Sequence, residues 1–134
     1  MMYDKLIDHA KQIMQRAYAP YSNFYVGAAI LSESGTIYSG CNVENAAYPV
    51  GSCAEAGAIS AMIAGGDKQI KAIAVTGRGD ELCTPCGGCR QRIREFAKAD
   101  TPVLICDETG IRLQTTLEEL LPHSFGPDNL ICSQ

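Results

Sequence analysis

The sequence lacks an excess of positive charge. It holds 11 lysine and arginine residues against 15 aspartate and glutamate residues, for a formal net charge of −4 and an isoelectric point near 5.1. The basic residues are scattered, and their densest cluster is Arg90, Arg92 and Arg94. A long contact with a nucleic-acid backbone requires clustered lysine and arginine. We therefore expect no nucleic-acid partner, and a small molecule is the better hypothesis for the ligand.

No stretch of the sequence has the pattern expected of a signal peptide or of a membrane span. The first 14 residues, MMYDKLIDHAKQIM, carry charged and ionisable side chains where a signal peptide requires an apolar run. The longest stretch free of charge, residues 17–32, is interrupted by Pro20, Ser22 and Asn23, which makes it a poor membrane span. We therefore expect a cytoplasmic protein without a membrane partner.

Repeats, low-complexity tracts and linkers are absent as well, so we expect one domain over residues 1–134. Apolar periodicity and turn residues predict helices over residues 3–18, 53–63, 86–98 and 117–121. Short apolar runs predict strands over residues 24–32, 36–41, 72–75 and 103–106, the first two as a hairpin. This order indicates an α/β fold in which helices cover both faces of a sheet.

Seven cysteines occur in a chain that shows no export signal. In a reducing compartment, clustered cysteines more often bind metal or act in catalysis than form disulfides. Cys86 and Cys89 are three residues apart at the start of a predicted helix, so both can reach one ion. Cys53 begins another predicted helix and can be the third ligand. Three protein ligands leave one position of tetrahedral zinc open to water, which is typical of a catalytic site.

Glu55 lies two residues from Cys53, where its carboxylate can handle the protons of a water activated by zinc. One carboxylate can serve as both base and acid only if its pKa is raised toward neutrality. Burial beside a formally anionic zinc–trithiolate centre would raise it. Glu55 is therefore the predicted catalytic residue.

Two other interpretations of the cysteines remain open at this point. Cys86 and Cys89 could form a redox dithiol, or they could belong to a structural zinc site with Cys83 as its fourth ligand, because the three are evenly spaced. A Thr-Pro dipeptide, however, separates Cys83 from the helix that aligns the other two. Neither alternative gives a purpose to the Cys-Ala-Glu element that contains Glu55, and we therefore prefer the catalytic interpretation.

Four segments of the chain resemble the small cytidine deaminases that bind zinc through three cysteines. They are residues 18–24 (YAPYSNF), 42–49 (NVENAAYP), 85–91 (PCGGCRQ) and 120–127 (LLPHSFGP), and only the third is shared by all zinc deaminases. The likeness covers nearly the whole chain. It implies a three-layer α/β/α sandwich around a mixed sheet of about five strands, and one zinc ion per chain. It also implies hydrolysis of cytidine and 2′-deoxycytidine to uridine and 2′-deoxyuridine with release of ammonia, as in pyrimidine salvage.

The resemblance also implies roles for residues outside the cysteine cluster. Asn42 and Glu44 would bind the ribose 3′-hydroxyl, Phe24 would pack on the cytosine ring, and the backbone around Ala54 would meet the base. The pattern alone favours other roles, namely a turn for Asn42 and Glu44 and a core position for Phe24.

Small members of this family are homotetramers whose active sites are completed by neighbouring subunits. The resemblance therefore implies a homotetramer in which Phe125 reaches a neighbour's substrate and Tyr48 lies near the interface. Symmetric closure of oligomers is compatible with this expectation without predicting it.

One position departs from the family pattern. An arginine commonly follows the Cys-Ala-Glu element, whereas Ala56 follows it here. A cation close to the thiolates would draw charge off the sulfurs and strengthen zinc as a Lewis acid. Arg90, adjacent to Cys89, is the nearest arginine in sequence that could supply this charge.

Three other functions fit parts of the sequence. An aminonucleoside-antibiotic deaminase shares the Cys-Ala-Glu and Pro-Cys-x-x-Cys elements, but residues 42–49 and the Phe-Gly-Pro ending favour plain nucleosides. A nucleic-acid editing deaminase is disfavoured by the acidic charge balance. A non-enzymatic domain with structural zinc leaves Glu55 unexplained.

Overall fold

The computed structural model describes residues 2–78 and 82–130. Five strands form one mixed sheet in the order β2-β1-β3-β4-β5. They are β1 (Val26–Ser32), β2 (Ile37–Cys41), β3 (Ile70–Gly77), β4 (Pro102–Asp107) and β5 (Gly110–Thr116). β3 and β4 run parallel, and the other neighbouring pairs are antiparallel. The mixed sheet that we expected is therefore confirmed.

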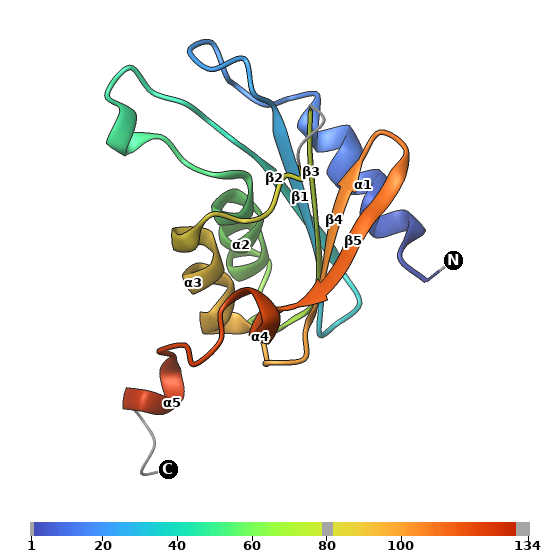
Figure 1. Ribbon diagram of the computed structural model, residues 1–134, viewed down its shortest axis with the longest axis vertical. Helices are drawn as coiled ribbons and strands as arrows, with labels where there is room; N and C mark the ends of the chain where they lie inside the picture. Colours follow the sequence, from blue (N-terminus) through green and yellow to red (C-terminus); the bar gives the residue numbers. More distant parts are fainter. Residues whose placement is uncertain (1, 79–81, 131–134) are drawn as a thin grey trace.

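Helices cover both faces of the sheet (Figure 1). α1 (Asp4–Met14) packs on one face, and α2 (Ala54–Ala64) and α3 (Gly87–Phe96) pack on the other. The short helices are η1 (Tyr48–Val50), α4 (Leu117–Leu120) and α5 (Pro127–Leu130). This arrangement confirms the three-layer α/β/α class. Within the described ranges, no helix has the length and apolar character needed to cross a membrane.

The two faces of the sheet carry side chains of different size. Alternate residues of a strand point to opposite faces, so each central strand contributes to both cores. Branched side chains line the face toward α2 and α3: Ile30, Ile73, Val75, Val103 and Ile105. The face toward α1 is lined mainly by small ones: Ala29, Ala72, Ala74 and Cys106, with Leu104. Burial on both faces explains why the central strands are continuous apolar runs in the sequence.

Two glycines allow the helices to approach the sheet closely. A Cβ atom on Gly40 of β2 would lie 2.3 Å from the backbone nitrogen of Ala58 in α2. On Gly27 of β1 it would lie 2.1 Å from the carbonyl oxygen of Ala10 in α1. No side chain fits at such distances, so glycine is required at both positions. The contact at Gly40 fixes the first two turns of α2, which include Glu55, against the sheet.

Two of the differences between the structure and the predicted elements have a clear physical cause. The first helix ends at Met14 rather than at residue 18, because the N–H groups of the next three residues bond to carbonyls three positions back, a tighter turn than the α-helix. β5 was not predicted, because it is an edge strand whose Ile111 and Leu113 are 46% and 38% exposed. Its pairing with β4, rather than an apolar run of its own, holds it in the sheet.

Candidate active site

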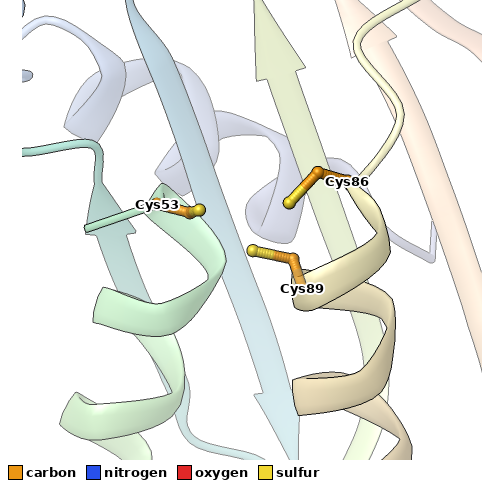
Figure 2. A group of neighbouring side chains, drawn as sticks. All are labelled: Cys53, Cys86 and Cys89. Carbon is orange, nitrogen blue, oxygen red and sulfur yellow. The ribbon is translucent and has the colours of Figure 1, made fainter. Parts of the chain in front are cut away.

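The beginnings of α2 and α3 bring three cysteines together. Cys53 is the residue that caps the N-terminus of α2, Cys86 caps that of α3, and Cys89 lies in the first turn of α3. Packing of both helices on the same face of the sheet places these two ends next to each other. The three side chains point toward one another across the gap between the helices (Figure 2).

The spacing of the sulfurs fits a single metal ion. The three Sγ atoms lie within 4.8 Å of one another. Ligands about 2.3 Å from a tetrahedral zinc ion are separated by about 3.8 Å, so one ion can contact all three sulfurs after a small adjustment. Soft thiolate ligands in a tetrahedral arrangement favour zinc among the common metal ions.

The protonation state of the three thiols depends on whether a metal cation is bound between them. Burial raises the pKa of Cys53 and, together with the nearby Glu55 carboxylate, that of Cys89. The pKa of Cys86 is lowered, chiefly by the backbone N–H of Cys89, as expected at a helix N-terminus. A divalent cation deprotonates the thiols that coordinate it, so zinc would hold all three as thiolates.

Cys83 lies outside this cluster. Among the residues that the structure describes, the group whose atoms could share an ion is Cys53, Cys86 and Cys89. Cys83 instead packs against the hydrophobic core, and burial, followed by the charge of Glu55, raises the pKa of its thiol to about 11. This placement argues against the structural site with four cysteines, because the Cys83 thiol is not in the group of sulfurs that lie close enough to share an ion.

Glu55 is buried next to the cysteine cluster, with 5% of its surface exposed. Burial raises the pKa of its carboxyl group above the ordinary value of 4.5. Its own backbone N–H, a contact with Cys89 and the positive charge of Arg92 offset part of this increase. The carboxyl group can therefore hold or release a proton closer to neutrality than an exposed glutamate can, as a group that serves as both acid and base requires.

A cavity of about 310 Å³ opens beside the cluster. Most of the predicted site residues line it: Phe24, Asn42, Glu44, Cys53, Ala54, Glu55 and Cys86. Cys83 contributes to the same wall. A small polar molecule that enters this cavity would therefore meet both the thiols and the carboxyl group. Larger hollows of about 740 and 720 Å³ lie elsewhere on the surface, away from the cysteine cluster.

Asn42 and Glu44 hold the loop that follows α1. The Asn42 amide accepts a bond from Val26 N at 2.9 Å and donates one to Phe24 O at 2.9 Å. The Glu44 carboxylate accepts bonds from the backbone N–H groups of Tyr21 and Ser22 at 3.0 and 3.1 Å, and from the Ser22 hydroxyl. These bonds, above all that of the Ser22 hydroxyl, lower the pKa of Glu44. The role in a turn, favoured by the pattern alone, is therefore present in the structure.

Phe24 is 43% exposed, so the core position that the pattern alone favoured for it is wrong. Its backbone N–H donates to the Ser22 hydroxyl at 3.0 Å, which holds the backbone of Phe24 beside the cavity that the residue lines. Ser22 was not singled out by our sequence analysis. It lies inside the segment 18–24, and its hydroxyl links Glu44 to Phe24.

Tyr48 and Phe125 do not line this cavity. Tyr48 begins η1, is 74% exposed and makes an edge-to-face contact with Tyr21, with 5.9 Å between the ring centroids. The two tyrosines and Glu44 border an adjacent depression. Phe125 lies in the segment after α4 and is 58% exposed. Within one chain, the structure does not bring these two aromatic residues into the site.

Arg90 is directed away from the sulfurs. Its Nε donates to Pro85 O and its Nη1 to Leu120 O, both at 2.8 Å. Arg92 instead places Nη1 at 3.8 Å from Cys89 Sγ. Residues three apart on a helix lie on the same side, and this rule could have identified Arg92 as the cation beside the cluster.

Comparison with known proteins gives consistent matches. Residues 2–105 match the family model of the cytidine and deoxycytidylate deaminase zinc-binding region. The chain is 43% identical to the cytidine deaminase of Sporosarcina psychrophila over 130 residues, which cover 97% of this chain and 96% of the relative. It is also 39% identical to the cytidine deaminase of Halalkalibacterium halodurans over 93% of this chain and 95% of the relative.

Solved structures agree with the sequence matches. The crystal structure of cytidine deaminase from Burkholderia pseudomallei superposes with a TM-score of 0.87 at 41% identity, covering 93% of this chain and all of the other. That from Mycobacterium tuberculosis superposes with a TM-score of 0.80 at 35% identity, covering 94% and 98% of the two chains. These matches confirm the resemblance seen in the four sequence segments. The chain belongs to the zinc-binding family of cytidine and deoxycytidylate deaminases.

Proposed function

We propose that this protein is a cytidine deaminase that converts cytidine and 2′-deoxycytidine to uridine and 2′-deoxyuridine, with water consumed and ammonia released. The observation that carries this proposal is the buried Glu55 carboxyl group beside three cysteines that fit a zinc ion, with Glu55, Cys53 and Cys86 in the wall of one cavity. Identity of 43% to a curated cytidine deaminase over nearly the whole chain supports the same substrate.

The chemistry follows from the groups around the cavity. Zinc held by Cys53, Cys86 and Cys89 supplies, when bound, a water molecule of lowered pKa as the nucleophile. Glu55 accepts a proton from this nucleophile and delivers one to N3 of the cytosine ring, which makes C4 electrophilic. The oxygen of the nucleophile adds to C4, and Glu55 then transfers the hydrogen of the resulting C4 hydroxyl group to the amino nitrogen, so that the C4–N bond breaks, ammonia leaves and C4 becomes a carbonyl carbon. Its raised pKa suits both transfers.

Substrate selection rests on other residues that line the same cavity. Phe24, with its partly exposed ring, is placed to pack on the pyrimidine, and the backbone around Ala54 to meet the base. Asn42 and Glu44 would bind the sugar hydroxyl. The pKa of Glu44 is lowered, so this carboxylate is negatively charged at neutral pH and would repel a phosphate. Nucleosides should therefore be accepted, and nucleoside monophosphates rejected.

A homotetramer with shared active sites is part of the proposal. Tyr48, Val50 and Phe125 are 74%, 68% and 58% exposed. Aromatic side chains are enriched on surfaces that bind another protein, and the exposed rings of Tyr48 and Phe125 fit such a role. A second copy of the chain would cover them, with Phe125 reaching the substrate in its neighbour's cavity and Tyr48 at the interface.

The cytoplasm is the compartment that suits this site. All six of the cysteines that the structure describes are free thiols, and free thiols persist in a reducing compartment. Zinc binding by thiolates also requires that they stay reduced.

The absorbance change from cytidine to uridine tests the proposal. The zinc-loaded protein should act on cytidine and 2′-deoxycytidine and should show kcat/KM lower by at least about a hundredfold for cytidine monophosphate and free cytosine. Cys86→Ser should lose both zinc and turnover. A protein that holds zinc but leaves all four compounds unchanged would refute the proposed function, and comparable kcat/KM for the monophosphate would refute the role given to Glu44.

A further inference from the structure

Two of the three cysteines lie at the beginning of α3, and side chains in its later turns bind residues 124–128. Gln91 Nε2 donates to Phe125 O at 2.7 Å. Arg94 Nε donates to Ser124 Oγ at 2.8 Å, and its Nη2 forms an ion pair with Asp128 Oδ1 at 2.7 Å. Three side-chain bonds from one helix therefore hold residues 124–128 on both sides of Phe125.

Few apolar contacts hold this segment otherwise. Among residues 121–130, only Gly126 is buried, and α5 has no buried residue. A hollow of about 740 Å³, lined by Arg94, Leu117 and Ser124 among others, lies between α3 and the segment. In Figure 1, α5 lies beyond α3, away from the sheet. The polar contacts of α3, rather than the core, therefore determine where this segment lies.

Gly126 shows how closely Arg94 fits the segment. A Cβ atom on Gly126 would lie 2.3 to 2.6 Å from Cζ, Nη2 and Nη1 of the Arg94 guanidinium group. The guanidinium group therefore packs directly on the backbone next to Phe125. Because the clash would be with the end of a flexible side chain, a methyl group there would displace Arg94 without disturbing the core.

We infer that Arg94 is a positioning residue for Phe125. By bonding to Ser124 and Asp128 on either side, it fixes the orientation in which the segment presents the Phe125 ring outward to a second copy of the chain. This inference rests on the shared active site of the proposed function. The side chain of Asp128 is 76% exposed, so loss of the ion pair should change the position of the segment more than the overall stability.

The test compares Arg94→Gln and Gly126→Ala with Phe125→Ala in the zinc-loaded protein. Phe125→Ala should raise KM for cytidine by about tenfold, as truncation of an aromatic residue central to an interface does. Arg94→Gln and Gly126→Ala should each raise KM by about fivefold, in keeping with the loss of one or two hydrogen bonds. kcat, zinc content and the tetramer seen by light scattering should be unchanged.

A double variant separates positioning from a general structural effect. If Arg94 acts through Phe125, Arg94→Gln should add nothing to KM once Phe125→Ala is present. Arg94→Lys keeps the charge but cannot bond to Ser124 and Asp128 in the same way, so its KM should lie between those of the wild type and Arg94→Gln. Arg112→Gln, which removes an arginine paired with Asp107 on the β4–β5 hairpin, is the matched control and should leave KM unchanged.

The outcomes distinguish this inference from the proposed function. An unchanged KM in Phe125→Ala would refute the shared site itself. A raised KM in Phe125→Ala with wild-type values in Arg94→Gln and Gly126→Ala would refute only the role of Arg94. Additive effects in the double variant would also refute it, because they would show that Arg94 acts independently of Phe125.

Discussion

Replacing Glu55 by glutamine should make the protein more stable while it removes activity. The carboxyl group is 5% exposed, and burial raises its pKa from the ordinary value of 4.5. Each unit of such an increase costs about 1.4 kcal/mol of folding free energy wherever the group is ionised in both states. An amide of the same shape carries no charge. We therefore expect an unfolding free energy about 0.5–2 kcal/mol higher at pH 8, the range that stabilising substitutions commonly give.

The sign of the pH dependence follows from the direction of the shift. Because the pKa of Glu55 is higher in the folded than in the unfolded protein, the penalty is complete above the folded value. It disappears as the pH falls through the folded value toward 4.5. The stability advantage of Glu55→Gln should thus be largest at alkaline pH and shrink toward acid. A bound zinc ion with three thiolates is formally anionic and so would not reverse this direction.

Urea unfolding from pH 6 to 8 checks the predicted gain in stability, and turnover of cytidine over the same range checks the predicted loss of activity. Both are measured at equal zinc content. Turnover should fall at least about 10²–10⁴-fold, the contribution of general acid–base catalysis. Glu95→Gln, which removes an exposed carboxylate from α3, is the matched control and should change neither quantity. A variant that is no more stable than wild type at pH 8 would refute the cost of burial. Activity within tenfold of wild type would remove Glu55 from the mechanism.

Three further predictions concern the elements around this residue. Cys83→Ser should keep full zinc content in elemental analysis while Cys86→Ser loses it, and equal losses would show that the ligand set is wrong. Gly40→Ala should lower the unfolding free energy by about 1–3 kcal/mol, as overpacking does, because its Cβ would lie 2.3 Å from a backbone nitrogen of α2. Gly87→Ala, whose Cβ would have no atom within 4 Å, is the control. Equal urea midpoints for the two variants would contradict the close packing at Gly40. Glu44→Gln should raise KM for cytidine by more than about tenfold, and a wild-type KM would assign the residue to the loop alone. Hydrogen bonds lower the pKa of Glu44, so the stability that they supply should be present at neutral pH. It should decline as the pH falls through the pKa of Glu44 in the folded protein.

The candidate site divides into residues that the sequence alone identified and residues that needed the structure. Two local groups of residues could be identified without tertiary information, because helix geometry places residues a few positions apart on the same side. The groups are Cys53 with Glu55, and Cys86 with Cys89. Their roles as ligands and catalytic residue stay predictions that the variants above test. Arg92 was overlooked in favour of Arg90, because neighbours in sequence do not face each other on a helix, whereas residues three apart do.

Phe24 shows why the burial of a single side chain is harder to predict from the sequence than the helix or strand around it. An aromatic residue next to an apolar run is more often part of the core, yet Phe24 is 43% exposed at the cavity wall. β5 was not predicted because it lacks an apolar run of its own. As an edge strand, it is held in the sheet by hydrogen bonds with β4 rather than by its own side chains.

The sequence by itself determined the central strands, the helices that carry the cysteines and the family to which the chain belongs. Apolar runs, cap positions and short motifs act over a few residues, so the local chain specifies them. Only the tertiary structure decided that α2 and α3 begin side by side, that Cys83 packs against the core, and that Arg94 holds the segment of Phe125. The bonds of Arg94 join residues 30 or more positions apart. Such relations depend on packing at contacts such as Gly40 against α2, which no local pattern encodes.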